Sequence, residues 1–185
     1  MKYQTYNIEK VKKATFVANK ITIIENNNKF IEILSNVVEK VITQFNGKVI
    51  NKRLTNAIIN EFNSQYENND MSIYCSLDFS YHNNKCKLNI TFYPEKCAYD
   101  QRIERAIYVY YDSDNRLLLD KTISEINELK NHITNWNNDI KIAIEQYDTY
   151  LEQAKKLDEQ ITNFLNSCPY GILENITFSN AFAIR

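Results

Sequence analysis

The chain has 185 residues and a formal net charge of −1, and its 26 Asn and 24 Ile contrast with only two Gly and two Pro. Phosphate-binding loops, dinucleotide fingerprints and nucleophile elbows need glycines at short intervals, so this composition excludes them. The length is sufficient for one domain, or two small ones, to fold without disulfides or metal ions. The excess of Asn and Ile is typical of an AT-rich genome.

The hydropathy pattern argues against a membrane protein. The N-terminus lacks the charged and apolar regions of a signal peptide, and no apolar run reaches the ~18 residues that span a bilayer. We therefore expect a cytoplasmic protein without a membrane partner, whose four cysteines are reduced.

The first 70 residues are predicted to be mainly helical. One or two helical turns are expected within residues 8–18 and a short strand over residues 21–24. Apolar residues at steps of three and four predict an amphipathic helix over residues 28–45. Gly47 is placed to end this helix in the left-handed conformation, and Asn51 is placed to cap a second helix. The second helix carries Leu54, Ile58, Ile59 and Phe62.

From Met71 the apolar residues alternate with polar ones, which predicts a β-hairpin with its turn at Asn83 and Asn84. A two-residue turn at these positions sets the pairing of the two strands. The expected pairs are Cys75 with Phe92, Leu77 with Ile90, Phe79 with Leu88, and Tyr74 with Tyr93. All apolar partners then share one face of the hairpin.

A third strand is predicted over residues 103–111, and residues 116–119 are expected to return as a fourth strand after a turn. The stretch of residues 120–166 contains neither Gly nor Pro, and its apolar residues follow alternating steps of four and three. We expect one long helix there, unbroken or gently bent, in preference to a break at residues 135–139. Its heptads favour a homodimer through this helix. A short C-terminal strand is expected over residues 172–184.

These elements predict an α+β fold with N-terminal helices, an antiparallel sheet of three to five strands, and a long C-terminal helix with coiled-coil-like heptads. Residues 1–70 form the helical part. Residues 71–185 contain the hairpin sheet and the helix over residues 120–166, and we expect one continuous folded unit.

Catalytic and metal-binding patterns are missing from the sequence. The four cysteines lack the C-x-x-C spacing of zinc sites. The segment after Asp112 departs from the calcium-binding loop, because Leu117 occupies the position that requires Gly. Asp78 and Lys87 fit two positions of a metal-dependent nuclease, but Lys85 replaces the second acid. We therefore predict no catalytic residue, metal or cofactor, and we expect Trp136 to be a packing residue.

Tyrosine is the residue type that most suggests binding. Tyr74, Tyr93, Tyr108 and Tyr110 occupy the face opposite the apolar one on their strands. An exposed set of this kind is suited to a protein-binding patch or to base stacking. The alternative is that the N-terminal helices cover this second face.

The leading hypothesis for function is a non-enzymatic macromolecular binding protein. We expect an inhibitor from a phage or mobile element that binds and blocks a host protein or ribonucleoprotein complex, such as a CRISPR nuclease. An alternative is a nucleic-acid-binding regulator that uses the basic first third of the chain. A metal-dependent hydrolase is a second alternative. The candidate nucleic-acid-binding residues are Lys10, Lys12, Lys13, Lys48, Lys52 and Arg53.

Overall fold

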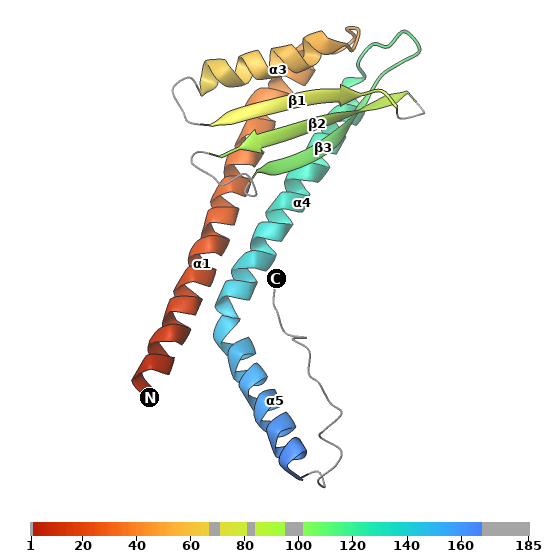
Figure 1. Ribbon diagram of the computed structural model, residues 1–185. Helices are drawn as coiled ribbons and strands as arrows, with labels where there is room; N and C mark the ends of the chain where they lie inside the picture. Colours follow the sequence, from red (N-terminus) through yellow and green to blue (C-terminus); the bar gives the residue numbers. More distant parts are fainter. Residues whose placement is uncertain (1, 67–70, 81–83, 95–101, 168–185) are drawn as a thin grey trace. The chain divides into compact units, whose positions relative to one another are not determined.

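The computed structural model describes residues 2–66, 71–80, 84–94 and 102–167, with the side chains of residues 2–11 left out. The chain divides into two compact units, Met1–Lys141 and Ile142–Arg185. Helices precede a three-stranded antiparallel sheet in the first unit, and a long helical region follows the sheet (Figure 1). The predicted α+β class is confirmed.

The N-terminal helical region is longer than expected. Helix α1 (Lys2–Ile33) continues through a π-helical turn, η1 (Leu34–Glu39), into α2 (Lys40–Gln44). The predicted strand over residues 21–24 is wrong, because these residues lie inside α1. A short apolar run fits a strand or a helix equally well when it is read alone, and the helix on both sides decides its conformation here.

The turn between α2 and α3 (Lys52–Gln65) forms as the sequence predicted. Gly47 has a φ of +68°, and the Asn51 side chain accepts a 2.8 Å hydrogen bond from the backbone N–H of Arg53. Gly47 therefore ends the first helical region, and Asn51 caps the second.

Replacing Gly47 by alanine is expected to lower the free energy of unfolding by about 1 kcal/mol, because an L side chain is strained at this φ. A Cβ atom on Gly47 would meet nothing within 4 Å, so the cost comes from the backbone alone. Urea denaturation measures the change. Gly47→Asn is the matched control and should be less destabilised, because Asn tolerates positive φ; equal losses in both variants would contradict this explanation.

The sheet has the order β1-β2-β3, with β1 at Ser72–Asp78, β2 at Lys85–Tyr93 and β3 at Ile103–Tyr110. The hairpin is confirmed, but its predicted register is wrong by two residues. The observed pairs are Ile73 with Phe92, Tyr74 with Thr91, Cys75 with Ile90, and Leu77 with Leu88. A shift of two residues leaves every side chain on its predicted face.

The fourth strand does not form. Residues 116 and 117 make only isolated bridges, Val49 with Arg116 and Tyr111 with Leu117. The predicted turn before them is present, because the Asn115 N–H donates to the Asp112 carbonyl at 3.0 Å. The strand predicted over residues 172–184 lies outside the described residues.

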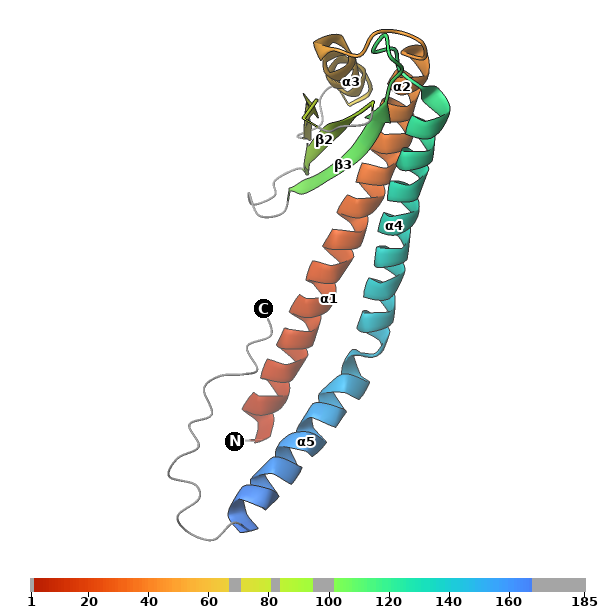
Figure 2. The same cartoon turned by 90° about the vertical axis from the view of Figure 1, so that its right-hand side faces the viewer.

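The core lies between one face of the sheet and the helices of the first unit. Phe30 of α1 and Phe92 of β2 are fully buried, with ring centroids 6.3 Å apart. Helix α3 contacts β1, and α1 contacts β3. Figure 2 shows α1 running past this side of the sheet, with α4 (Leu119–Glu145) beside α1.

The helical region predicted over residues 120–166 is present, and helical hydrogen bonds cross its interruption at Gln146, from the Gln146 N–H to the Ile142 carbonyl at 2.9 Å and from the Tyr150 N–H to the Gln146 carbonyl at 3.1 Å. It is divided at Gln146 into α4 and α5 (Tyr147–Ser167), whereas residues 135–139 lie within α4. Heptad positions Ile133, Asn137 and Ile140 of α4 are buried, and no described residue of α5 is. Pairing with a second copy stays a prediction.

Candidate functional site

The candidate site is the face of the sheet that points away from the core, which we call the open face. It carries the even-numbered residues of β1 and β3 and the odd-numbered residues of β2. Apart from Thr91, which is buried, these side chains are exposed or half-buried. The N-terminal helices pack on the opposite face, where Phe30 of α1 lies beside Phe92, so the alternative that they cover this face is not supported. Helix α4 reaches this face at Tyr110.

The structure brings all four predicted tyrosines to the open face, but as two pairs. Tyr74 pairs with Thr91 and Tyr93 pairs with Ser72, so the two rings are diagonal neighbours and do not lie directly opposite each other as predicted. Tyr108 and Tyr110 lie toward the other end, on β3. A row of small side chains crosses the three strands between the pairs: Ser76, Asn89 and Ala106.

The two pairs differ in their freedom to contact a partner. Tyr74 is 57% exposed, whereas Tyr110 donates a 3.0 Å hydrogen bond from its hydroxyl to Glu125 Oε1 of α4. This hydrogen bond to a carboxylate, followed by partial burial, raises the pKa of Tyr110. Lys85 Nζ lies 4.0 Å above the Tyr108 ring, within the range of a cation–π interaction. The end of the open face that carries Tyr74 and Tyr93 is therefore the more available to a binding partner.

Charge is balanced on the open face. Lys85 and Lys87 are countered by Asp78, directly opposite Lys87, and by Glu104. A hydrogen bond from the Ser80 hydroxyl lowers the pKa of Asp78, and the charge of Lys87 acts in the same direction. Asp78 is thus a stable carboxylate, and the face has no net charge to attract a polyanion.

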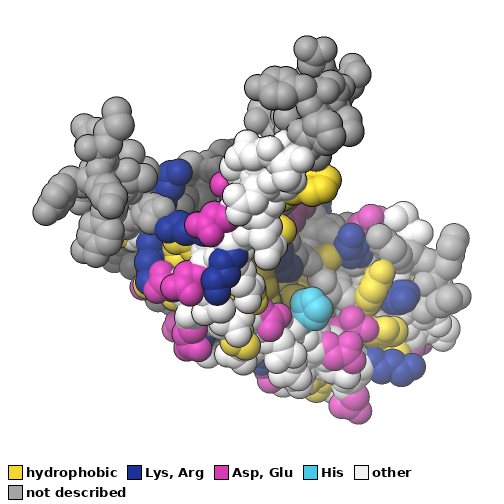
Figure 3. Space-filling model, turned by 90° about the horizontal axis from the view of Figure 1, so that it is seen from below, with side chains coloured by type: hydrophobic (Ala, Val, Ile, Leu, Met, Phe, Trp, Pro, Cys, Tyr) yellow, Lys and Arg dark blue, Asp and Glu magenta, His cyan; other side chains and the backbone are white. Residues whose placement is uncertain are grey.

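The basic residues of the nucleic-acid hypothesis are not brought together. Lys12 and Lys13 lie on α1, whereas Lys48 follows α2 and Lys52 and Arg53 begin α3. The helical stretch from residue 13 to residue 44 is about 45 Å long at ~1.5 Å per residue. Lys10 belongs to α1, but its side chain lies outside the described residues. On the face shown in Figure 3, basic and acidic side chains are interleaved.

The described residues contain no group of His, Cys, Asp and Glu side chains arranged to hold a metal ion. Burial raises the pKa of the Cys75 thiol to about 12 and that of Cys86 to about 11, so both are poor nucleophiles at neutral pH. His132 is exposed on α4. His82, Cys97 and Cys168 lie outside the described residues.

One feature of the structure was not predicted, a pocket of about 450 Å³ between α1, the start of β3 and α4. Trp136 lines it and is 42% exposed, so it is not the buried packing residue that the sequence suggested. The sequence did contain a signal for the pocket. The stripe of α1 that packs in the core from Phe30 onward carries Asn and Thr upstream of Phe30.

The described helices include none that is both long and apolar enough to cross a membrane. In the comparisons with known proteins, no family model, curated protein or solved structure matches this chain.

Proposed function

We propose that this chain is a non-enzymatic protein that binds another protein through the open face of its sheet. The observation that carries the proposal is the grouping of Tyr74, Tyr93, Tyr108 and Tyr110, all exposed or half-buried, on the face of the sheet opposite the core. Tyrosine provides a large contact area for little loss of side-chain freedom, and the neighbouring Ser and Asn residues supply adaptable hydrogen bonds.

The charges favour a protein partner over a nucleic acid. A nucleic-acid surface gains most of its affinity from basic side chains that neutralise phosphates. On the open face Lys85 and Lys87 are offset by Asp78 and Glu104. The basic residues elsewhere are separated along α1 and α3, which weakens the case for a continuous phosphate-binding surface.

We further propose that the partner belongs to the machinery of a host cell and that binding blocks it. This proposal is supported by the AT-rich composition and by the lack of glycine-dependent catalytic motifs, both common among small proteins of phages and mobile elements. Inhibition by covering a surface requires no catalytic group. A host protein or ribonucleoprotein complex, such as a CRISPR nuclease, is the class of target.

The test begins with capture of a partner by the tagged full chain from a lysate of the native host. The partner is then purified, and its affinity for the wild-type chain and for variants is measured. Tyr74→Ala is expected to weaken binding by about tenfold or more, because exposed tyrosines at protein interfaces often dominate the binding energy.

The matched control is Tyr150→Ala in α5, because Tyr150 is 56% exposed and lies outside the sheet. This variant should bind like the wild type. Failure to capture any partner, or equal losses for the two variants, would contradict the proposal. Binding of DNA or RNA that weakens steeply with salt would support the nucleic-acid alternative instead.

A further inference from the structure

One wall of the pocket between α1, β3 and α4 is formed by α1, and most of its residues are polar. From Phe30 onward, one stripe of α1 and η1 packs in the core at steps of three and four, through Ile33, Leu34 and Val37. Toward the N-terminus the same stripe is mostly polar. It consists of Asn19, Thr22, Ile23, Asn26 and Asn27, and all five line the pocket. Asn27 is buried, Ile23 and Asn26 are half-buried, and Asn19 and Thr22 are exposed, so this wall of the pocket is polar and open to solvent.

The opposite wall is formed by β3, and it carries a charged side chain among apolar ones. Arg105 lies on the core-facing side of β3, between Ile103 and Ile107, which are both buried. Its guanidinium carbon is 5.5 Å from the centre of the Trp136 ring, and its Nη1 donates a 2.8 Å hydrogen bond to the Glu104 carbonyl. Arg105 is half-buried, so its guanidinium places a positive charge at an accessible wall of the pocket, beside an aromatic ring.

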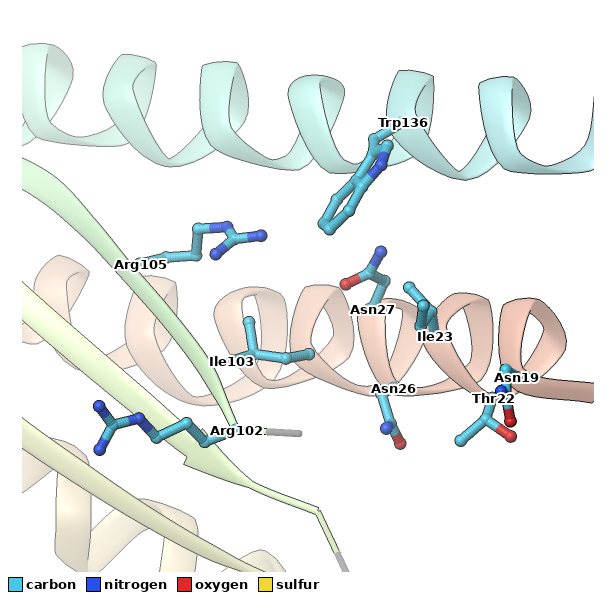
Figure 4. A pocket seen from close by; sticks show the side chains of 9 residues that line it. All are labelled: Asn19, Thr22, Ile23, Asn26, Asn27, Arg102, Ile103, Arg105 and Trp136. Carbon is cyan, nitrogen blue, oxygen red and sulfur yellow. The ribbon is translucent and has the colours of Figure 1, made fainter. Parts of the chain in front are cut away.

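Trp136 closes the pocket from α4. Figure 4 shows the Trp136 ring and the Arg105 side chain directed toward the same space, with the Asn27 side chain facing them from α1. Asn27 is held in place because its Nδ2 donates to Asn137 Oδ1 at 2.8 Å. Arg102 stands at the start of β3, where its Nη2 lies 3.7 Å from Glu104 Oε2, and Figure 4 shows it directed away from Trp136. Arg105 is therefore the cation closest to the aromatic wall.

We propose that this pocket binds a planar aromatic anion of the mononucleotide class. The exposed indole of Trp136 offers a flat surface for a base. Arg105 offers a guanidinium for a phosphate, which it can bind through two parallel hydrogen bonds. The amides of Asn19 and Asn26 supply donors and acceptors for the edge of a base. The volume of about 450 Å³ lies within the range of small-molecule sites.

This site is separate from the open face. Ile103 and Arg105 lie on the core side of the sheet, whereas the four tyrosines lie on the other side. Nucleotide binding therefore does not depend on the proposed protein partner, and either proposal can fail without the other.

The chain contains a single tryptophan, Trp136, so its fluorescence reports on the pocket directly. The full chain is titrated with AMP, GMP, CMP and UMP, and tryptophan fluorescence and binding heat are recorded. We expect at least one nucleotide to give a saturable change. Arg105→Gln should weaken that binding by about tenfold or more, because it removes a charge-assisted hydrogen bond.

Arg53→Gln is the matched control, since Arg53 is exposed on α3 and lies outside the pocket. It should bind the nucleotide like the wild type. Asn26→Leu fills the pocket from α1 without altering β3, and it should also weaken binding, so the test does not rely on one substitution. Thermal unfolding of each variant shows whether the fold is retained.

Four results would overturn the proposal. The first is the absence of any fluorescence or heat change with all four nucleotides at millimolar concentration. The second is unchanged affinity in folded Arg105→Gln and Asn26→Leu. The third is inorganic phosphate binding as tightly as the best nucleotide, because the aromatic wall would then contribute nothing. The fourth is the unphosphorylated nucleoside binding equally well, because Arg105 would then have no anion to bind.

Discussion

Replacing Phe30 by alanine is expected to lower the free energy of unfolding by about 3–5 kcal/mol. The Phe30 ring is fully buried, and its centroid lies 6.3 Å from that of Phe92 across the interface of α1 and the sheet. Truncation removes a large apolar side chain and leaves a cavity between two elements that cannot both move to fill it. Typical domains unfold with only ~5–15 kcal/mol, so this loss is large. Urea denaturation followed by circular dichroism measures it.

Phe164→Ala is the matched control for this prediction. Phe164 lies in α5 and is 65% exposed, so its truncation should change the free energy of unfolding by about 0.5 kcal/mol or less. A loss below about 1 kcal/mol for Phe30→Ala would mean that α1 does not pack on the sheet as described.

The second large effect is expected at Asn137, the polar position within the buried seam of α4. Its Oδ1 accepts a 2.8 Å hydrogen bond from Asn27 Nδ2, and its Nδ2 donates to Asn28 Oδ1 at 2.9 Å. Asn137→Ala should cost about 1–3 kcal/mol, because the amide of Asn27, itself 2% exposed, loses its partner in the interior. Chemical denaturation measures the change.

The structure predicts that the two asparagines are coupled. Replacing both Asn27 and Asn137 by leucine should cost less than the sum of the single leucine substitutions, because no amide is then left without a partner. Asn138→Ala, at an exposed position of the same helix, should stay within about 0.5 kcal/mol of the wild type. Additive losses in the double variant would contradict a direct Asn27–Asn137 interaction.

The amides of Asn27 and Asn28 also explain how α4 accommodates a polar residue at a buried position. Asn137 is a polar residue at a buried heptad position, and Asn27 and Asn28 of α1, from the same chain, satisfy its amide. A buried amide pair of this kind commonly fixes the alignment of two helices. Within the first unit, α1 thus packs against α4 at this position, and pairing of the helical region with a second copy stays a prediction.

The hairpin shows where sequence patterns stop being informative. Alternation of apolar and polar residues identified both strands and both faces correctly, because side chains alternate across a strand whatever its partner is. A slip of two residues preserves that alternation, so the pattern could not distinguish the observed pairing from the predicted one. The tertiary structure decided that Tyr74 faces Thr91 and that Tyr93 faces Ser72.

The two candidate sites also differ in how far the sequence predicted them. The open face was predictable, because period two alone assigns Tyr74, Tyr93, Tyr108 and Tyr110 to the side opposite the core. The pocket was not, because its walls come from α1, β3 and α4, and the residues on them are far apart in the chain. Its sequence signal was the change from apolar to polar residues upstream of Phe30 along one stripe of α1, and that stripe exists only once residues 21–24 are known to be helical.

The shortage of glycine and proline had consequences that the sequence determined by itself. It excluded glycine-dependent sites, and it made Gly47 the one position at which the N-terminal helical region was expected to end, as it does at a φ of +68°. These are local effects, because backbone freedom depends on the residue itself. Tertiary packing decided the strand register and the pocket around Trp136. Each of these depends on contacts between distant segments, which no local pattern encodes.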